Sequence, residues 1–173
     1  MSDLTADVLA IIKSISSGDL LTWVITYFVD ALILSYFIYT FYNIKAPKGY
    51  IIITAFIYSV CILLVRKTYI FYKIQFGSHS IILAILFMLI VFLVYKLPLM
   101  RSAIGSVACF AMIYLASPVI IKLISISGIN LELVAKQPLL LALIGYTEDI
   151  FIIISILFMK FTGFNYNKLL EKI

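Results

Sequence analysis

Charged residues are scarce in this chain of 173 residues, of which only 12% are Asp, Glu, Lys or Arg while 65% are hydrophobic. Soluble globular domains carry about twice that share of charge, so a soluble domain is excluded. The mean hydropathy of +1.20 indicates an integral membrane protein that lies in a lipid bilayer. The net charge of +5 comes mainly from Lys and Arg near the ends of apolar segments, so it gives no indication of nucleic-acid binding.

Histidine and cysteine are also few, with one His and two Cys in the chain. His79 has no neighbouring Cys, Asp or Glu in the sequence, and Cys61 and Cys109 lie inside apolar segments without a CxxC spacing. The sequence holds no HExxH arrangement and no glycine-rich phosphate loop. We therefore predict no metal, no cofactor and no catalytic residue, and we expect the protein not to be an enzyme.

Long apolar runs fill most of the chain and predict its fold class, an all-α polytopic membrane protein with about five transmembrane helices. A helix needs about 20 mostly apolar residues to cross a bilayer. Trp23 and Tyr27 near one end of the first run, with Tyr39 and Tyr42 near the other, are typical of the aromatic belts at the two membrane surfaces. The predicted spans are residues 20–42, 50–65, 81–95, 100–124 and 139–161.

The first 18 residues lack the basic start and the cleavage site of a signal peptide, so we expect them to be retained. Their apolar residues recur at helical spacing opposite Asp3 and Asp7, which favours a short amphipathic helix on the membrane surface over a frayed tail. The predicted organisation is an amphipathic N-terminal segment at 1–18, a helical membrane domain at 19–162 and a short polar tail at 163–173.

The stretch 68–80 is too polar to span a membrane and rich in aromatic residues, which is typical of an interfacial or re-entrant segment. With the N-terminus outside, the inner side holds seven basic residues against six outside, a small bias. The acidic start, with Asp3, Asp7 and Asp19, and the compact basic turns at 45–48 and 96–101 favour an outer N-terminus and a cytoplasmic C-terminus. The outer aromatic and basic loop 66–79 and the loop 125–138 would then form a signal-facing surface. The candidate signal-facing residues are Arg66, Lys67, Tyr69, Tyr72, Lys73 and His79.

Small residues recur along the fourth predicted span. Membrane helices associate through close backbone approach, which small side chains permit. We therefore predict that a neighbouring helix packs against this span. The candidate helix-packing residues are Gly105, Ser106, Ala116 and Ser117.

Three acidic residues lie in the middle of predicted spans, Asp30 in the first and Glu148 and Asp149 in the last. A carboxylate at hydrocarbon depth is unfavourable by about 3 kcal/mol, so such residues normally face a bundle interior or a wet cavity. If the first and last spans pack together, the three side chains would share a polar pocket able to respond to protons or to bind a cation. The alternative is that each acid only forms hydrogen bonds that hold helices together.

A resemblance to a known family adds to this interpretation. Segment 76–82 (FGSHSII), an aliphatic span and segment 95–104 (YKLPLMRSAI) resemble the membrane sensor region of accessory-gene-regulator-type and sporulation-type sensor histidine kinases of Gram-positive bacteria. Asp30, segment 128–132 (GINLE) and Gln137-Pro138-Leu139 are also similar, and the resemblance covers residues 20–162. It implies a quorum-sensing type of sensor domain that receives an external peptide or small molecule. A kinase portion has no counterpart in these residues, which implies action through a membrane or cytoplasmic signalling partner or a homodimer.

Two other functions fit the same sequence. A small transport subunit or a proton-coupled carrier could use the mid-membrane carboxylates, although we find no inverted repeat in the sequence. An immunity or assembly factor that binds another membrane protein is also compatible and would not need the carboxylates. All three functions place the protein in the cell membrane as a multi-pass protein.

Overall fold

The computed structural model describes residues 2–74, 78–127 and 138–170, and all regular structure in this part of the chain is helical. Five of the described helical segments are long and apolar enough to cross a membrane, which confirms the predicted all-α, multi-pass fold. The elements are α1 (Ser2–Lys13), α2 (Ser17–Thr22), the π-helix η1 (Trp23–Tyr27), α3 (Phe28–Phe41), α4 (Gly49–Phe71), α5 (Ser78–Tyr95), α6 (Leu99–Ile126), α8 (Pro138–Thr162) and α9 (Tyr166–Leu170).

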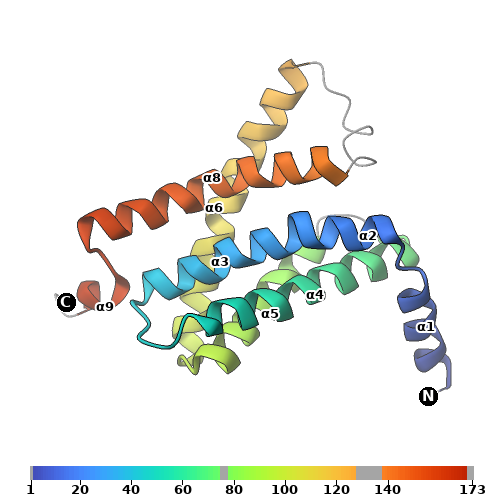
Figure 1. The fold of residues 1–173 in the computed structure, drawn as a ribbon, viewed down its shortest axis with the longest axis horizontal. Coiled ribbons are helices and arrows are strands. Elements are labelled where there is room, and N and C mark those ends of the chain that lie inside the picture. The colour runs from blue at the N-terminus through green and yellow to red at the C-terminus, as the bar shows by residue number, and fades with distance from the viewer. Residues whose placement is uncertain (1, 75–77, 128–137, 171–173) are drawn as a thin grey trace.

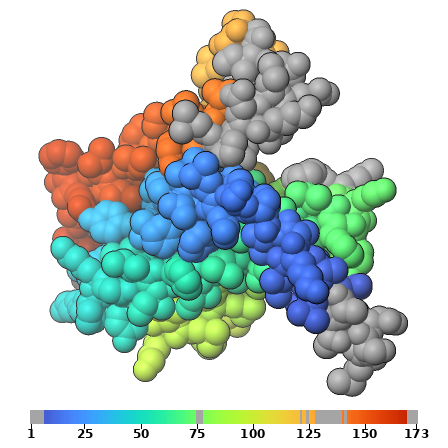
Figure 2. Space-filling view, turned by 45° about the vertical axis from the view of Figure 1, so that its right-hand side comes forward, coloured from blue at the N-terminus to red at the C-terminus, as the bar shows by residue number. Residues whose placement is uncertain are grey.

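Helix α3 lies at the centre of the bundle, between α4 and α8, and α5 packs against both α4 and α6 (Figures 1 and 2). Helix α6 crosses behind them, and its C-terminal end projects beyond the other helices. Helices α1 and α9 lie at opposite ends of the bundle. We call these two ends the α1 end and the α9 end.

The first span runs from Ser17 to Phe41 and combines α2, η1 and α3. It begins with a capping box, in which the Ser16 hydroxyl accepts from the Asp19 amide and the Asp19 carboxylate accepts from the Ser16 amide. The aromatic-belt prediction is wrong for Tyr27 and Tyr42, which are only 7% and 2% exposed. Both rings point into the bundle because their hydroxyls have partners there: Arg66 donates to Tyr27, and Tyr42 donates to the Arg101 carbonyl.

The second span is longer than predicted, since α4 continues past Arg66 and Lys67 to Phe71. The two basic residues do not end the helix because each has a partner on the first span: Arg66 contacts Tyr27, and Lys67 forms an ion pair with Asp19 at 2.7 Å. The described part of the stretch 68–80 is therefore divided between two helices and the turn at 72–74 after α4, and its interfacial position stays a prediction. Residues 68–71 belong to α4 and residues 78–80 to α5, while residues 75–77 lie outside the described part.

The N-terminal helix α1 exists, but it is not clearly amphipathic. Its residues 8–12 are all apolar, so apolar side chains extend around the helix instead of forming one stripe. Ile11 is buried, whereas Val8, Leu9 and Ile12 are exposed. Helix α1 is tied to the end of α4, where the Tyr72 hydroxyl donates to the Asp7 carboxylate at 2.8 Å; this hydrogen bond raises the pKa of Tyr72.

Helix α9 lies against the opposite end of the bundle. Gly163 has a φ of +64°, a left-handed conformation that glycine adopts without strain, and it turns the chain back after α8. Tyr166 then stacks on Phe41 with ring centroids 5.4 Å apart, and the Asn167 amide donates to the Tyr42 carbonyl at 2.8 Å. The start of the predicted polar tail is thus attached to the end of α3.

Candidate functional site

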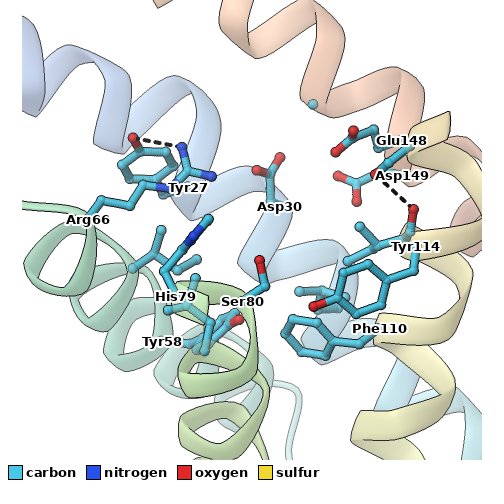
Figure 3. Close-up of a pocket in the computed structure, with 16 residues that line it drawn as sticks. Tyr27, Asp30, Tyr58, Arg66, His79, Ser80, Phe110, Tyr114, Glu148 and Asp149 are labelled. Carbon is cyan, nitrogen blue, oxygen red and sulfur yellow. Dashed lines mark hydrogen bonds between the residues drawn. The ribbon is translucent and has the colours of Figure 1, made fainter. Parts of the chain in front are cut away.

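A partly open cavity of about 240 Å³ is lined by residues of all five spans (Figure 3). Ligand sites in membrane proteins are commonly cavities between helices that hold a few polar groups. This cavity has apolar walls formed by residues such as Leu34, Ile62 and Leu83. Its polar lining residues are Tyr27, Asp30, Tyr58, Arg66, His79, Ser80, Tyr114, Ser117, Glu148 and Asp149.

The three mid-span acids line this one cavity, Asp30 from the first turn of α3 and Glu148 and Asp149 from α8. Asp149 is only 3% exposed. Among the described residues, Asp30 Oδ1 and Asp149 Oδ2 are buried without a hydrogen-bond partner. Two facing carboxylates away from water need a compensating positive charge, so the arrangement can hold a shared proton or a cation.

Glycine brings α8 close to the Asp30 carboxylate. A Cβ atom at Gly145 would lie 3.7 Å from each carboxylate oxygen of Asp30 and 3.6 Å from the Thr26 methyl group. Asp149 follows Gly145 by one helical turn, so both residues are on the same face of α8. The Asp30 side chain therefore extends across the backbone of Gly145, and Figure 3 shows it pointing toward Glu148 and Asp149.

The π-helix η1 sets the position of α3 at the cavity. A π-helical turn leaves backbone groups out of the regular hydrogen-bond pattern and is frequent at functional sites. Here the Ile25 carbonyl accepts a hydrogen bond from the Tyr146 hydroxyl of α8. This contact joins η1 to α8 one turn before Asp149, and Asp30 follows η1 within one turn of α3.

Arg66 forms the basic side of the cavity. Its guanidinium carbon lies 4.7 Å from the centre of the Tyr27 ring, and Nη1 donates to the Tyr27 hydroxyl at 3.2 Å. Its Nε is buried and has no hydrogen-bond partner among the described residues. Among the described residues, the ion pair with a nitrogen–oxygen distance within 4 Å joins Lys67 to Asp19. Arg66 therefore forms no ion pair with Asp30. Figure 3 shows Arg66 on one side of Asp30 and Asp149 on the other.

The six candidate signal-facing residues do not form one surface. Arg66 and His79 line the cavity, and His79 also packs edge-on against Tyr69. Tyr69 is buried and shares a hydrogen bond with Ser78, while Lys67 pairs with Asp19 and Tyr72 with Asp7. Lys73 is exposed, with a φ of 52° just after α4. Most of the second predicted loop, residues 128–137, lies outside the described residues.

The small residues of α6 lie at helix contacts and at the cavity. A Cβ atom at Gly105 would be 2.7 Å from Ile38 Cδ1 and 2.9 Å from the Tyr42 ring, so α6 and α3 approach closely there. Ser106 is buried, and Ala116 is buried beside Ile144 of α8. Ser117 lines the cavity.

Sequence reasoning missed several lining residues, among them Tyr27, Tyr58, Ser80, Tyr114 and Gly145. Tyr58 and Tyr114 are hydroxyl-bearing aromatic residues in the middle of apolar spans, which is the signal that could have identified them. Figure 3 shows the Tyr114 ring extending from α6 into the cavity. Within the described residues, no group of three His, Cys, Asp or Glu side chains could hold a metal ion.

Comparison with known protein families, with curated proteins and with solved structures finds no match for this chain. The interpretation of the site therefore depends on its own geometry and chemistry.

Proposed function

We propose that this protein is a non-enzymatic membrane receptor that takes a ligand into the acidic cavity and transmits its occupancy to the α9 end of the bundle. It would act through a partner protein or a second copy of itself. The N-terminus would lie outside and the C-terminus in the cytoplasm, so the ligand would enter from the outer side. The resemblance to the membrane sensor region of Gram-positive sensor histidine kinases supports the same function.

One observation carries this proposal: α3 contacts both the cavity and the C-terminal helix. Asp30 lines the cavity from the first turn of α3. At the other end, Phe41 and Tyr42 contact Tyr166 of α9 through ring stacking, and the Tyr42 carbonyl accepts from Asn167. A packed helix moves as a unit, so a displacement at Asp30 would alter the surface on which α9 docks.

The proposal is tested by the distance between α9 and the bundle. Spin labels would be attached to cysteines replacing Lys168 on α9 and Ile52 on the exposed face of α4, in a chain with Cys61→Ala and Cys109→Ala. Gly145→Leu fills the space beside Asp30, whereas Thr147→Leu adds a similar side chain on the exposed side of α8. We expect Gly145→Leu alone to shift the distance distribution in lipid nanodiscs. Equal distributions in the parent and both variants would contradict coupling between the cavity and α9.

A carrier is the second candidate, because the cavity touches all five spans and contains ionisable groups. A carrier must open its site alternately to both sides. On the α9 side, Ile38 and Tyr42 fill the contact with Gly105 of α6, so this tight contact would have to separate. Uptake of solute or protons by protein-containing vesicles would support transport over reception. An immunity or assembly factor would instead retain its activity after loss of the carboxylates.

A further inference from the structure

The acidic cavity contains unsatisfied hydrogen-bonding groups of both kinds. Among the described residues, Asp30 Oδ1 and Asp149 Oδ2 are buried acceptors without a partner, and Arg66 Nε is a buried donor without a partner. Asp149 is only 3% exposed, so its carboxylate lies inside the protein at the cavity. A buried polar group without a partner is unfavourable by about 1–3 kcal/mol, and by more when it is charged. The three groups together indicate a ligand that carries both donors and acceptors.

The charges of the cavity are separated in space. Asp30 and Asp149 interact with each other across the α3–α8 contact, and Glu148 adds a third carboxylate on the same side. Arg66 lies on the other side of Asp30, close enough to act on it electrostatically but held by Tyr27 instead of paired with the acids. An anion would be repelled by the carboxylates. A simple cation would leave the Arg66 donor unused.

The size and the walls of the cavity restrict the ligand further. A volume of about 240 Å³ is enough for a molecule the size of an amino acid and too small for a folded peptide. Part of the lining is apolar, formed by Leu34, Ile62, Leu83, Phe110 and Ile113. Such walls favour an aliphatic side chain on the ligand.

We propose that the cavity binds a small zwitterion of the amino-acid type with an aliphatic side chain. Its ammonium group donates to the partnerless oxygens Asp30 Oδ1 and Asp149 Oδ2, its carboxylate accepts from Arg66, and its side chain contacts the apolar part of the lining. This inference rests on the proposed function, whose ligand class it specifies. No bond is formed or broken in the binding step.

Three probes of similar shape test the two charged groups separately. L-leucine has both groups, isoamylamine has only the ammonium group, and 4-methylpentanoate has only the carboxylate. Binding to the protein in lipid nanodiscs would be measured by isothermal titration calorimetry. We expect L-leucine to bind at least about tenfold more tightly than isoamylamine and 4-methylpentanoate not to bind, because each charge-assisted pair contributes separately. Equal affinity for L-leucine and isoamylamine, or no binding of L-leucine, would overturn the proposal.

Matched variants locate the binding groups. Asp149→Asn keeps the side-chain shape and removes the carboxylate, and Arg66→Gln removes the guanidinium; each should weaken L-leucine binding by about tenfold or more. Lys67→Gln is the control, because the neighbouring Lys67 pairs with Asp19 instead of lining the cavity, and it should leave the affinity within about twofold. If one of the first two variants does not fold, Glu148→Gln provides a further test on the acidic side and should also weaken binding. Unchanged affinity in the variants that fold would place the zwitterion elsewhere and contradict the assignment.

Different results contradict the proposed ligand class and the proposed receptor function. A shift of the α9 label distance in Gly145→Leu without L-leucine binding would overturn the zwitterion and leave reception intact. Binding of L-leucine without any change at α9 would support the zwitterion and contradict reception.

Discussion

Near each of its ends, helix α3 packs against a glycine of a neighbouring helix, Gly105 of α6 and Gly145 of α8. The two contacts differ in which α3 atoms lie beside the glycine. At the α9 end, the Cβ position of Gly105 lies 2.7 Å from Ile38 and 2.9 Å from Tyr42, so α3 side chains occupy all the space that the glycine leaves. Nearer the α1 end, the Cβ position of Gly145 has the Asp30 oxygens at 3.7 Å and borders the cavity. Glycine therefore permits tight apolar packing at one end and access to a carboxylate at the other.

This difference separates stability from ligand binding within one bundle. The Gly105 contact includes large buried side chains and contributes packing energy. The Asp30–Asp149 contact brings two carboxyl groups together away from water, where two negative charges are unfavourable unless a proton or a cation compensates them. Substitutions at the two ends should consequently have effects of opposite sign on the free energy of unfolding.

The largest effect is expected for Gly105→Val. The added side chain overlaps Ile38 and the Tyr42 ring, and Tyr42 has little freedom to move because its hydroxyl is bonded to the Arg101 carbonyl. Overpacking of this kind destabilises a protein by about 1–3 kcal/mol. Thermal unfolding in detergent would measure the loss. Gly49→Val is the control, since a Cβ atom there meets nothing within 4 Å, and an equal loss in both variants would contradict tight packing at Gly105.

Asp149→Asn should stabilise the protein, unlike Gly105→Val, and raise the free energy of unfolding by about 1 kcal/mol in the absence of ligand. The amide keeps the side-chain shape and removes one of two neighbouring buried carboxylates. The measurement is again thermal unfolding, without added L-leucine. A clear decrease in stability would show that the carboxylate is already well satisfied and would remove the reason for expecting a ligand.

Asn167→Ala tests the attachment of α9 to α3. The variant loses the hydrogen bond from the Asn167 amide to the Tyr42 carbonyl, a loss of about 1 kcal/mol that should be confined to α9. Hydrogen exchange would show faster exchange in α9 and unchanged exchange in the cavity helices α4 and α5. If exchange became faster throughout the bundle, α9 would be part of its cooperative core instead of a separately docked output element.

Lys67→Gln should have the smallest effect, about 0.2–1 kcal/mol, because its ion pair with Asp19 is partly exposed. Screening by salt should reduce the difference from the parent protein further. Thermal unfolding at low and high salt measures it. A loss as large as that of Gly105→Val would mean that the α1 end depends on this ion pair as much as the α9 end depends on packing.

The sequence was enough to predict the fold class and the approximate spans, because hydropathy depends on residue type and helix length alone. It also identified Asp30, Glu148 and Asp149 as unusual, since charge in an apolar run is visible without a structure. It could not indicate which way side chains point, because most positions around these helices are apolar. Arg66 and Tyr27 were accordingly interpreted as surface residues, although they contact each other inside the bundle.

The contribution of glycine could not be predicted in the same way. Gly105 was expected to contact another helix, but Gly145 gave no signal in the sequence, since its importance depends on where the Asp30 side chain extends. The end of α4 was also misplaced, because the partners that let Arg66 and Lys67 continue the helix lie on the first span, far away in sequence.

The most direct test of the central claim is whether water-soluble reagents reach the acidic cavity. In a chain with Cys61→Ala and Cys109→Ala, Ser80→Cys would place a thiol at the cavity wall, and Leu115→Cys would place one on the outer face of α6, where Leu115 is 72% exposed. In intact vesicles, we predict that a trimethylammonium-bearing thiosulfonate modifies the Ser80→Cys variant faster than a sulfonate-bearing one, and that neither modifies Leu115→Cys readily. Failure of the cationic reagent to modify Ser80→Cys in correctly folded protein would contradict an accessible acidic cavity among the spans.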